Sequence, residues 1–308
     1  MVEITASMVK DLREKTSAGM MDCKKALVES DGNIDLAADW LRTKGLSAAA
    51  KKSGRIASEG LVGMAVNKTT GALIEVNAET DFVARNKDFQ QFVSSIAKLT
   101  LNSDGNIDTL KNSSYPDTNR NIIEELTHQI STIGENMTLR RVERISIEKG
   151  IVASYMHNTL TPTLGKIGVI VALSSEAETD FLNELGKKIA MHIAATKPLS
   201  ISKDTLDPIE IEKEHKFLAE QARESGKPEE IIEKMLVGRM NKFYEEVCLM
   251  EQTFVIDGES KIKDVIKSAS EKCGKSIKVS DFCIFVLGEG IDKKNEDFAA
   301  EVAAVVSN

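Results

Sequence analysis

Apolar positions near the start of the chain recur at the spacing of three short amphipathic helices. Thr5 is placed to cap the first helix, and Asn33 is placed to cap the third. Gly45 is predicted to end the third helix, because glycine is favoured just past a helix C-terminus. The small and basic residues 47–55 that follow are typical of a linker. The pattern therefore predicts a three-helix domain with its linker over residues 1–53.

A longer pattern occurs twice further along the chain. Residues 59–82 and 149–181 each show a strand, a turn, a second strand and a polar loop that opens a helix, and both end in AETDF. Residues 134–150 and 274–290 each show a glycine, a strand and a glycine-bounded turn. Such a repeat predicts two related α+β units, each with a small three-stranded antiparallel sheet and helices on one side. We place the units at residues 54–149, and at residues 150–200 together with 250–287.

An insertion interrupts the second unit. Strand signals vanish over residues 201–249, where apolar positions recur in steps of three and four on two segments separated by Gly226 and Pro228. This spacing predicts an antiparallel helical hairpin built like a two-stranded coiled coil. Residues 288–308 are predicted to add a C-terminal amphipathic helix. The seam of the hairpin is predicted to consist of Ile211, His215, Leu218 and Ala222 on one helix and Ile232, Leu236, Met240, Phe243 and Val247 on the other.

The two phenylalanines of the repeated pentapeptide differ in their surroundings. Phe181 begins a series of apolar residues at steps of four, which predicts that it belongs to a helix face in the core. Phe82 and Val83 precede the next helical stripe, which starts at Phe89, and polar residues flank them. The pattern leaves open whether Phe82 is buried or is an exposed aromatic of the kind that recognises a protein partner.

Composition narrows the class of protein. The chain has 308 residues, of which 42% are hydrophobic and 29% charged, as expected for a globular protein of two or three domains. Its net charge of −8 argues against nucleic acid as a partner, since nucleic-acid-binding surfaces are basic. No apolar run is long enough for a membrane span, and the first residues lack the apolar segment of a signal peptide. We therefore expect a cytoplasmic protein with neither a nucleic-acid nor a membrane partner.

Little in the sequence indicates chemistry. Residues 269–276, ASEKCGKS, match a loose phosphate-loop pattern, but such a loop needs a strand before it and a helix after it. Here a helix is predicted before the loop and a strand after it, so we expect no nucleotide site. The four histidines and four cysteines lack the spacing of a metal site or of an activated nucleophile. No catalytic residue, metal or cofactor is expected.

Seven blocks, in order along the chain, resemble the bacterial elongation factor Ts family. The third block reads EVNAETDFVARN and contains the first copy of the pentapeptide. The resemblance extends over almost the whole chain, so it is far more specific than any single block. The blocks are residues 16–27, 32–45, 75–86, 133–142, 190–198, 225–243 and 288–304.

The resemblance implies a guanine-nucleotide exchange factor for elongation factor Tu, acting in translation elongation and not an enzyme. It implies a UBA-like three-helix domain, a duplicated core, an inserted coiled-coil hairpin and a C-terminal helix. In the family, a Thr-Asp-Phe-Val segment approaches the GTPase and helps to displace its magnesium ion. The matching residues here are Thr80, Asp81, Phe82 and Val83.

Further contacts with elongation factor Tu are implied at Met20, Met21, Ile133, Gly134 and His157, and in the C-terminal helix. From the pattern alone, Met20 and Met21 suit the core of the small domain equally well. The chain departs from the commoner family pattern after His157, where a long loop is predicted over residues 158–166. The hairpin is also expected to offer a surface through which two copies of the chain form a homodimer.

Two other functions remain open at this level. One is a structural adaptor, in which the three-helix domain binds peptides or ubiquitin-like folds and the core dimerises. The other is a nucleotide-hydrolysing enzyme, which rests on the phosphate-loop match at residues 274–276 alone. Release of GDP from elongation factor Tu, with and without this protein, distinguishes exchange from both alternatives.

Overall fold

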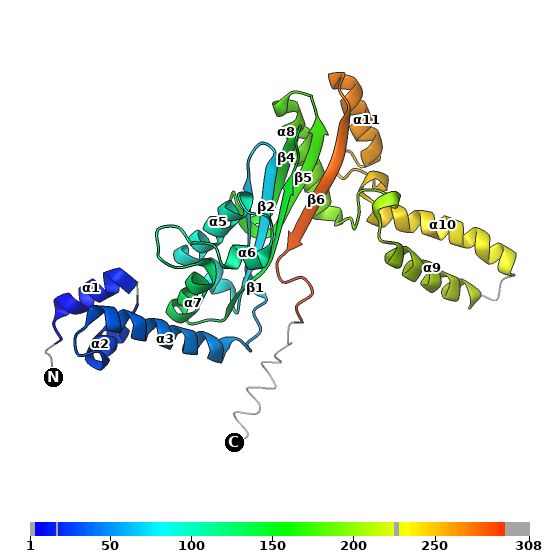
Figure 1. The fold of residues 1–308 in the computed structure, drawn as a ribbon. Helices are drawn as coiled ribbons and strands as arrows, with labels where there is room; N and C mark the ends of the chain where they lie inside the picture. The colour runs from blue at the N-terminus through cyan, green and yellow to red at the C-terminus, as the bar shows by residue number, and fades with distance from the viewer. Residues whose placement is uncertain (1–3, 17, 225–227, 293–308) are drawn as a thin grey trace.

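The computed structural model describes residues 4–16, 18–224 and 228–292. It shows a three-helix segment at one end, a central core built on an antiparallel sheet, and a helical hairpin that projects from the other end (Figure 1). The prediction of a mixed α+β fold is confirmed. The C-terminal helix predicted within residues 288–308 lies mostly outside the described residues. Among the described helices, none is both long and apolar enough to cross a membrane.

Three helices, α1 (Ala6–Thr16), α2 (Met20–Glu29) and α3 (Ile34–Lys52), form the N-terminal segment around a small apolar core. The side chain of Asn33 caps α3 as predicted, since its oxygen accepts hydrogen bonds from two backbone amides of the first turn. The prediction that Gly45 ends α3 is wrong. The helix continues to Lys52, so most of the predicted linker is helical.

Gly45 instead allows α3 to lie close to the core. It is buried against α7 (Ile122–Ile133), and a Cβ added to it would lie 3.5 Å from the Cβ of Ser131. Helices approach each other closely where small residues meet. The N-terminal segment is therefore attached to the core along α3.

The core contains two three-stranded antiparallel sheets, as the repeat predicts. The first has β2 (Thr70–Ala78) between β1 (Glu59–Val66) and β3 (Met137–Ser146). The second has β5 (Leu164–Ser175) between β4 (Ile151–Thr161) and β6 (Ile277–Val286). The two halves join into one six-stranded sheet, because β1 pairs with β5 at Val62↔Gly165 and Gly63↔Leu164.

Helices cover the two sheets in separate groups (Figure 1). Helix α5 (Lys87–Leu101), the short α6 (Ile107–Lys111) and α7 bury a first apolar cluster against β1–β3. Helices α8 (Thr179–Thr196) and α11 (Ile262–Cys273) bury a second cluster against β4–β6. A third cluster, which includes Leu73, Met156 and Ile170, lies between the halves. The burial of three apolar layers supplies the main driving force for the core fold.

The structure confirms that the two halves are related, down to single positions. Gly60 and Gly150 begin equivalent strands with φ of +120° and +122°, and each faces the carbonyl of a partner strand, Val76 or Leu173. Bulges occur at the matching sites Glu75/Val76 and Ala172/Leu173. A side chain at Gly60 or Gly150 would collide with that carbonyl, so glycine is required twice at the same place.

The strand–helix crossing also matches between the halves. In the first half, Gly63 on β1 faces Val93 on α5, and in the second half Ala153 on β4 faces Gly186 on α8. The glycine lies on the strand in the first half and on the helix in the second half. In both halves the two facing side chains therefore occupy a small combined volume. This correspondence aligns Val93 with Gly186.

The same alignment corrects the prediction about the pentapeptide. With Val93 matched to Gly186, Phe89 corresponds to Leu182, and the two AETDF copies are not structurally equivalent. Leu182 is buried, whereas Phe181 is half-buried at the edge of the second cluster, beneath the ammonium group of Lys272. The prediction that Phe181 is a core residue is therefore wrong by one helical position.

The first half has an extra turn where the copies diverge. The link from Val76 to Phe89 is longer than the link from Leu173 to Leu182 by four residues, the length of α4 (Asp81–Ala84). The second half folds without such a turn. Helix α4 is therefore an addition to the repeated scaffold, and it carries Phe82.

Helices α9 (Pro208–Arg223) and α10 (Glu229–Val247) form the inserted hairpin. The amide of Leu199 donates to the carbonyl of Val247 (2.8 Å), so the two ends of the insertion lie together. The predicted seam is only partly right, because His215 is exposed and Ala219 is buried in its place. On the first helix the buried seam residues are Ala219 and Ala222, which are three positions apart as on one face of a straight helix. They pack against Ile232 and Leu236 on the second helix.

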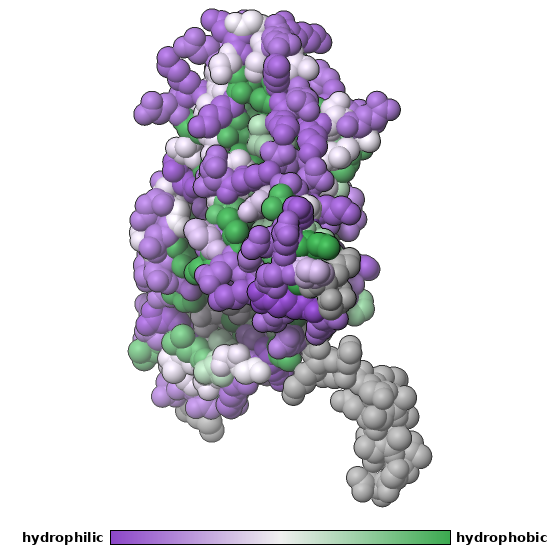
Figure 2. All heavy atoms as spheres, turned by 90° about the vertical axis from the view of Figure 1, so that its right-hand side faces the viewer, coloured by the Kyte–Doolittle hydropathy of each residue, from purple (hydrophilic) through white to green (hydrophobic). Residues whose placement is uncertain are grey.

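The end of the molecule with the hairpin is mainly hydrophilic. Figure 2 looks onto this side, and apolar side chains appear there in small separate groups among hydrophilic ones. Short 3₁₀ turns, η1 (Lys203–Thr205) and η2 (Leu249–Glu251), flank the hairpin at its junction with the core.

A buried histidine secures that junction. The ring of His192 on α8 is fully buried beside Phe254, with Nε2 2.9 Å from Oε1 of Gln252. Its Nδ1 accepts a hydrogen bond from the amide of Val255 (3.3 Å), so the neutral ring carries its proton on Nε2. Burial lowers the pKa of His192, and the Gln252 contact offsets this only in part.

This histidine predicts a loss of stability in mild acid. Because the folded-state pKa of His192 lies below its unfolded value of about 6.5, the unfolded state takes up a proton first as the pH falls. The free energy of unfolding should begin to decrease as the pH falls below about 7.5 and should continue to decrease through the unfolded pKa, measured by urea denaturation. His192→Asn should reduce the slope, and the part that remains includes the contribution of His128, whose pKa is also lowered by burial. Equal slopes for the parent and His192→Asn would contradict the assignment.

Candidate functional site: the turn between β2 and α5

The segment that joins β2 to α5, here called the α4 turn (residues 79–86), presents one apolar side chain to solvent. Val83 is 3% exposed and packs into the first apolar cluster, whereas Phe82 is 72% exposed. Successive residues of a helix point about 100° apart, so burial of Val83 directs Phe82 outward. The side chain of Asn86 caps α5 by accepting from the amides of Asp88 and Phe89, which fixes the end of the turn.

Two carboxylates hold the α4 turn against the end of α7. Glu135 accepts from both the amide (2.9 Å) and the hydroxyl (2.7 Å) of Thr80. In return, Glu79 accepts from the amide of Asn136 (2.5 Å). We call this reciprocal pair the carboxylate clamp. Hydrogen bonds to charged groups are stronger than neutral ones, so the clamp makes the position of Phe82 rigid.

The clamp brings together two of the predicted contact segments. Ile133 and Gly134 directly precede Glu135, and Gly134 ends α7 with φ of +92°. Ile133 is half-buried against the first apolar cluster, and Gly134 is exposed. Thr80, Asp81, Phe82, Ile133 and Gly134 therefore lie in one region, with Val83 beneath them as an anchor.

The end of the N-terminal segment reaches the same region. Nη1 of Arg55 lies 3.4 Å from Glu79, and the carbonyl of Arg55 accepts from the side-chain amide of Asn136 (2.7 Å). On the outer side of the turn, the exposed carboxylate of Asp81 lies 3.9 Å from Arg85. Exposed ion pairs of this kind contribute little to stability, so Asp81 is available to a partner.

The sequence did not reveal the clamp residues Glu79, Glu135 and Asn136. Their partners are more than 50 positions away along the chain, so no local spacing could connect them. One sequence feature could have indicated them. Glu79 is adjacent to Thr80 and Glu135 is adjacent to Gly134, and both pairs lie in blocks that resemble the family.

Met20 and Met21 lie at the start of α2 on the N-terminal segment, and both are largely exposed. The alternative that they form the core of the small domain is wrong. That core consists of other residues, which include Leu12, Cys23 and Leu27. No hydrogen bond or apolar cluster of the described residues joins either methionine to the α4 turn.

His157 lies on the other half of the core. It is exposed on β4, and its Nδ1 is 3.1 Å from the hydroxyl of Tyr155. The long loop predicted after it is wrong, because β4 continues to Thr161 and β5 begins at Leu164. Only Pro162 and Thr163 form the turn, and a bulge in β4 absorbs the irregular spacing. The structure therefore places His157 on a rigid strand.

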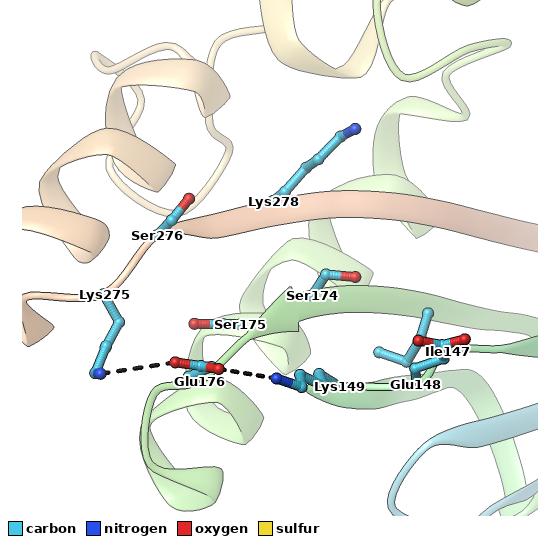
Figure 3. Close-up of a pocket in the computed structure, with 9 residues that line it drawn as sticks. All are labelled: Ile147, Glu148, Lys149, Ser174, Ser175, Glu176, Lys275, Ser276 and Lys278. Atoms are coloured by element: carbon cyan, nitrogen blue, oxygen red, sulfur yellow. Dashed lines mark hydrogen bonds and ion pairs between the residues drawn. The ribbon is translucent and has the colours of Figure 1, made fainter.

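The last two residues of the phosphate-loop match, Lys275 and Ser276, line an open cavity of about 590 Å³ at the end of the second sheet (Figure 3). Gly274 caps α11 in the left-handed region, and β6 follows, so the order is helix and then strand as predicted. Lys275 lies 3.8 Å from Glu176, which also accepts from Lys149 (3.1 Å). Hydrogen bonding and charge from Lys149, together with Lys275, lower the pKa of Glu176.

This cavity has no features of a nucleotide site. Figure 3 shows the side chain of Lys275 directed toward Glu176, and no helix begins at the loop to present its amides. Among the described residues, no cluster of three or more His, Cys, Asp or Glu side chains is arranged to hold a metal ion. Glu176 instead forms exposed ion pairs with Lys149 and Lys275 at this site.

Comparison with known proteins places the chain in a family. The profile of the family described as elongation factor TS matches residues 79–289. The elongation factor Ts proteins of Rhodospirillum centenum and of Rhodospirillum rubrum are each 56% identical over 305 residues, with 99% of both chains covered. That of Agrobacterium fabrum is 50% identical over 305 residues, again with 99% of both chains covered. By this full-length similarity, the chain belongs to the elongation factor Ts family.

Proposed function

We propose that this protein is a guanine-nucleotide exchange factor for elongation factor Tu in translation elongation. It accelerates the release of GDP by stabilising the nucleotide-free state and by displacing the bound magnesium ion of its partner. The observation that carries the proposal is the exposed Phe82, which stands on an added turn held rigid by the carboxylate clamp. Membership of the family supplies the identity of the partner.

Linkage explains how such a contact releases a nucleotide. A factor that binds the nucleotide-free state more tightly must weaken nucleotide binding by the same free energy. GTPases of this kind hold GDP partly through Mg²⁺, which bridges phosphate oxygens to few protein ligands. Insertion of Phe82 beside that site, with Asp81 as an adjacent negative charge, would favour the conformation without metal. The protein makes and breaks no covalent bond in this process.

The rigid turn lowers the cost of this insertion. Ordering a loop on binding consumes part of the binding free energy, whereas a preorganised group avoids that cost. Thr80 and Glu135 hold the turn before the partner arrives, and Val83 anchors it from below. In this proposal Thr80 and Val83 therefore act by placing Asp81 and Phe82.

The remaining contacts spread over the molecule. We place Ile133 and Gly134 beside Phe82 in the interface, His157 on the second half, and Met20 and Met21 on the N-terminal segment. That segment acts as a UBA-like docking domain, and α9 with α10 acts as a coiled-coil module through which a homodimer can form. The protein works in the cytoplasm without a cofactor of its own, nucleic acid or membrane.

Release of fluorescent GDP from elongation factor Tu tests the proposal. Substoichiometric amounts of this protein should accelerate release, because an exchange factor dissociates and acts again. Unchanged release, with a measurable complex, would support an adaptor in its place. Hydrolysis of nucleotide by this protein alone would support an enzyme and overturn the proposal.

A further inference from the structure

The carboxylate of Glu75 lies fully buried on β2, on the side that faces the second half of the core. Residues alternate across a strand, and the neighbour on the same side, Leu73, belongs to the apolar cluster between the halves. Burial of a charge in such a layer is costly unless hydrogen bonds and opposite charges surround it.

Four donors surround this carboxylate. Its Oε1 accepts from Nη1 of Arg140 (3.0 Å), the side-chain amide of Asn77 (2.9 Å) and the backbone amide of Gly288 (2.9 Å). Its Oε2 accepts from Nε of Arg141 (2.6 Å). Burial raises the pKa of Glu75, but the bonds from Gly288, Asn77 and Arg141 outweigh that effect and lower it. Glu75 is therefore ionised at neutral pH.

These contacts, here called the Glu75 cluster, join the two halves of the core. Glu75, Asn77 and the two arginines belong to β2 and β3, whereas Gly288 follows β6. Arg141 also donates to the carbonyl of Val286 (2.9 Å) and lies over the ring of Phe285 (4.3 Å). Arg140 donates to the carbonyl of Glu289 (2.5 Å). The turn after β6 is thus bound to the first half at several points.

Gly288 fits this joint closely. It has φ of +71°, and a Cβ added to it would lie 2.4 Å from the carbonyl oxygen of Ser58, just before β1. The turn therefore contacts the first half from two sides, through Ser58 and through the Glu75 cluster.

Other contacts also link the two halves of the core. The strand pairing between them consists of Val62↔Gly165 and Gly63↔Leu164. Two further backbone hydrogen bonds cross the joint, from the amide of Met64 to the carbonyl of Thr163 (2.9 Å) and from the amide of Val152 to the carbonyl of Lys68 (3.0 Å), and Lys166 lies 3.8 Å from Glu59. The side chains packed between the halves are mainly apolar. Apolar contact is non-directional and tolerates sliding, whereas hydrogen-bonded charges require one geometry. To these directional contacts the Glu75 cluster adds a fully buried charge with four donors.

The repeated scaffold does not itself need this carboxylate. Glu75 and Ala172 occupy matching positions at the two bulges, and Ala172 is buried in the same apolar cluster. A strand with this bulge therefore forms with a methyl group at the position. The charge is a feature of the first half, on the strand that leads directly into the α4 turn.

We propose that Glu75 is a positioning residue for nucleotide exchange, which sets the spacing between Phe82 on the first half and His157 on the second so that both contact one partner. The inference rests on the proposed function, since it requires that both residues bind elongation factor Tu. Loss of the carboxylate would leave each half folded but free to change its angle.

The test uses Glu75→Gln in the full-length chain and measures GDP release against the concentration of the factor. The concentration for half-maximal acceleration should rise roughly tenfold, within the usual range of coupling between sites, while the saturated rate changes by less than about twofold. Glu125→Gln is the matched control. Glu125 is also buried and paired with an arginine, Arg120 (2.6 Å), but both residues lie within the first half.

A double-mutant cycle distinguishes the positioning role of Glu75 from a purely structural role. In the parent, His157→Ala should raise the half-maximal concentration, and in Glu75→Gln the same change should have little further effect, because His157 is already displaced. Full additivity, or an equal shift in Glu125→Gln, would overturn the positioning role. If Glu75→Gln does not fold, Arg140→Gln removes one link while Arg141 remains.

Failure of the proposed function would look different. In that case the parent chain itself would not accelerate GDP release at any concentration, and both proposals would be overturned together. A parent that is active, with His157→Ala unchanged in every background, would overturn the inference about Glu75 and leave exchange through Phe82 intact.

Discussion

Phe82→Ala is expected to slow the GDP release stimulated by this protein by about 10- to 100-fold. Full burial of a phenylalanine side chain is worth about 1.5–3 kcal/mol, and each 1.4 kcal/mol is about a tenfold change in an equilibrium constant. In the free protein this side chain is 72% exposed, so most of its surface can still be buried in the complex. Asp81→Ala should act in the same direction with a smaller effect. The measurement is the exchange rate at saturating and subsaturating factor.

The same substitution should hardly affect the fold. Removal of an exposed side chain usually costs less than about 1 kcal/mol, so denaturant unfolding of Phe82→Ala should match the parent. Val83→Ala is the informative neighbour, because Val83 is buried and its loss should destabilise the first half by about 1–3 kcal/mol. If Phe82→Ala unfolds more readily than Val83→Ala, or exchanges at the parental rate, Phe82 is not the inserted group.

The second pentapeptide provides a comparison at the level of stability. Phe181 is half-buried and lies under Lys272 at the rim of the second cluster, so Phe181→Ala should cost less than the loss of a core phenylalanine. The helical series at steps of four placed it in the core because periodicity identifies the face of a helix. Periodicity does not show which residue of the first turn lies deepest, and here that residue is Leu182.

The repeated halves were predictable because they depend on local geometry. A glycine before each pair of strands, a short turn and alternating apolar residues are read directly from the chain. Their union into one six-stranded sheet was not, since it depends on two residue pairs between β1 and β5. The same holds for α3, where helix propensity at Gly45 was overridden by close packing against α7.

The candidate site was predictable only in outline. The position of Phe82 ahead of the α5 stripe allowed exposure, but a one-turn helix is too short to reveal its own orientation. That orientation comes from Val83 below and from Glu135 beside it, and Glu135 is 55 residues away from Thr80. Likewise, the sequence shows Glu75 only as an acidic residue in a strand. Its contacts with Gly288 and the two arginines depend on the tertiary fold.

Gly150→Ala should be the most damaging small substitution in the second half of the core. At φ of +122°, an alanine is strained, and its Cβ would lie 1.9 Å from the carbonyl oxygen of Leu173. Backbone strain and overpacking together should reduce the free energy of unfolding by about 3–5 kcal/mol. Gly60→Ala should cause a similar loss. Gly60 has the same conformation, and a Cβ added to it would lie 2.2 Å from the carbonyl oxygen of Val76. Urea denaturation of both variants measures the effect.

Gly274→Ala is the control that separates the collision from the conformation. Gly274 also has positive φ, at +66°, but a Cβ there would meet nothing within 4 Å. Its replacement should therefore cost only the strain of the left-handed region, about 1 kcal/mol. Similar losses at Gly150 and Gly274 would mean that the strands separate at little cost around Leu173. A large loss at Gly150 and Gly60 alone would show that both halves depend on the same close approach of a strand to its partner.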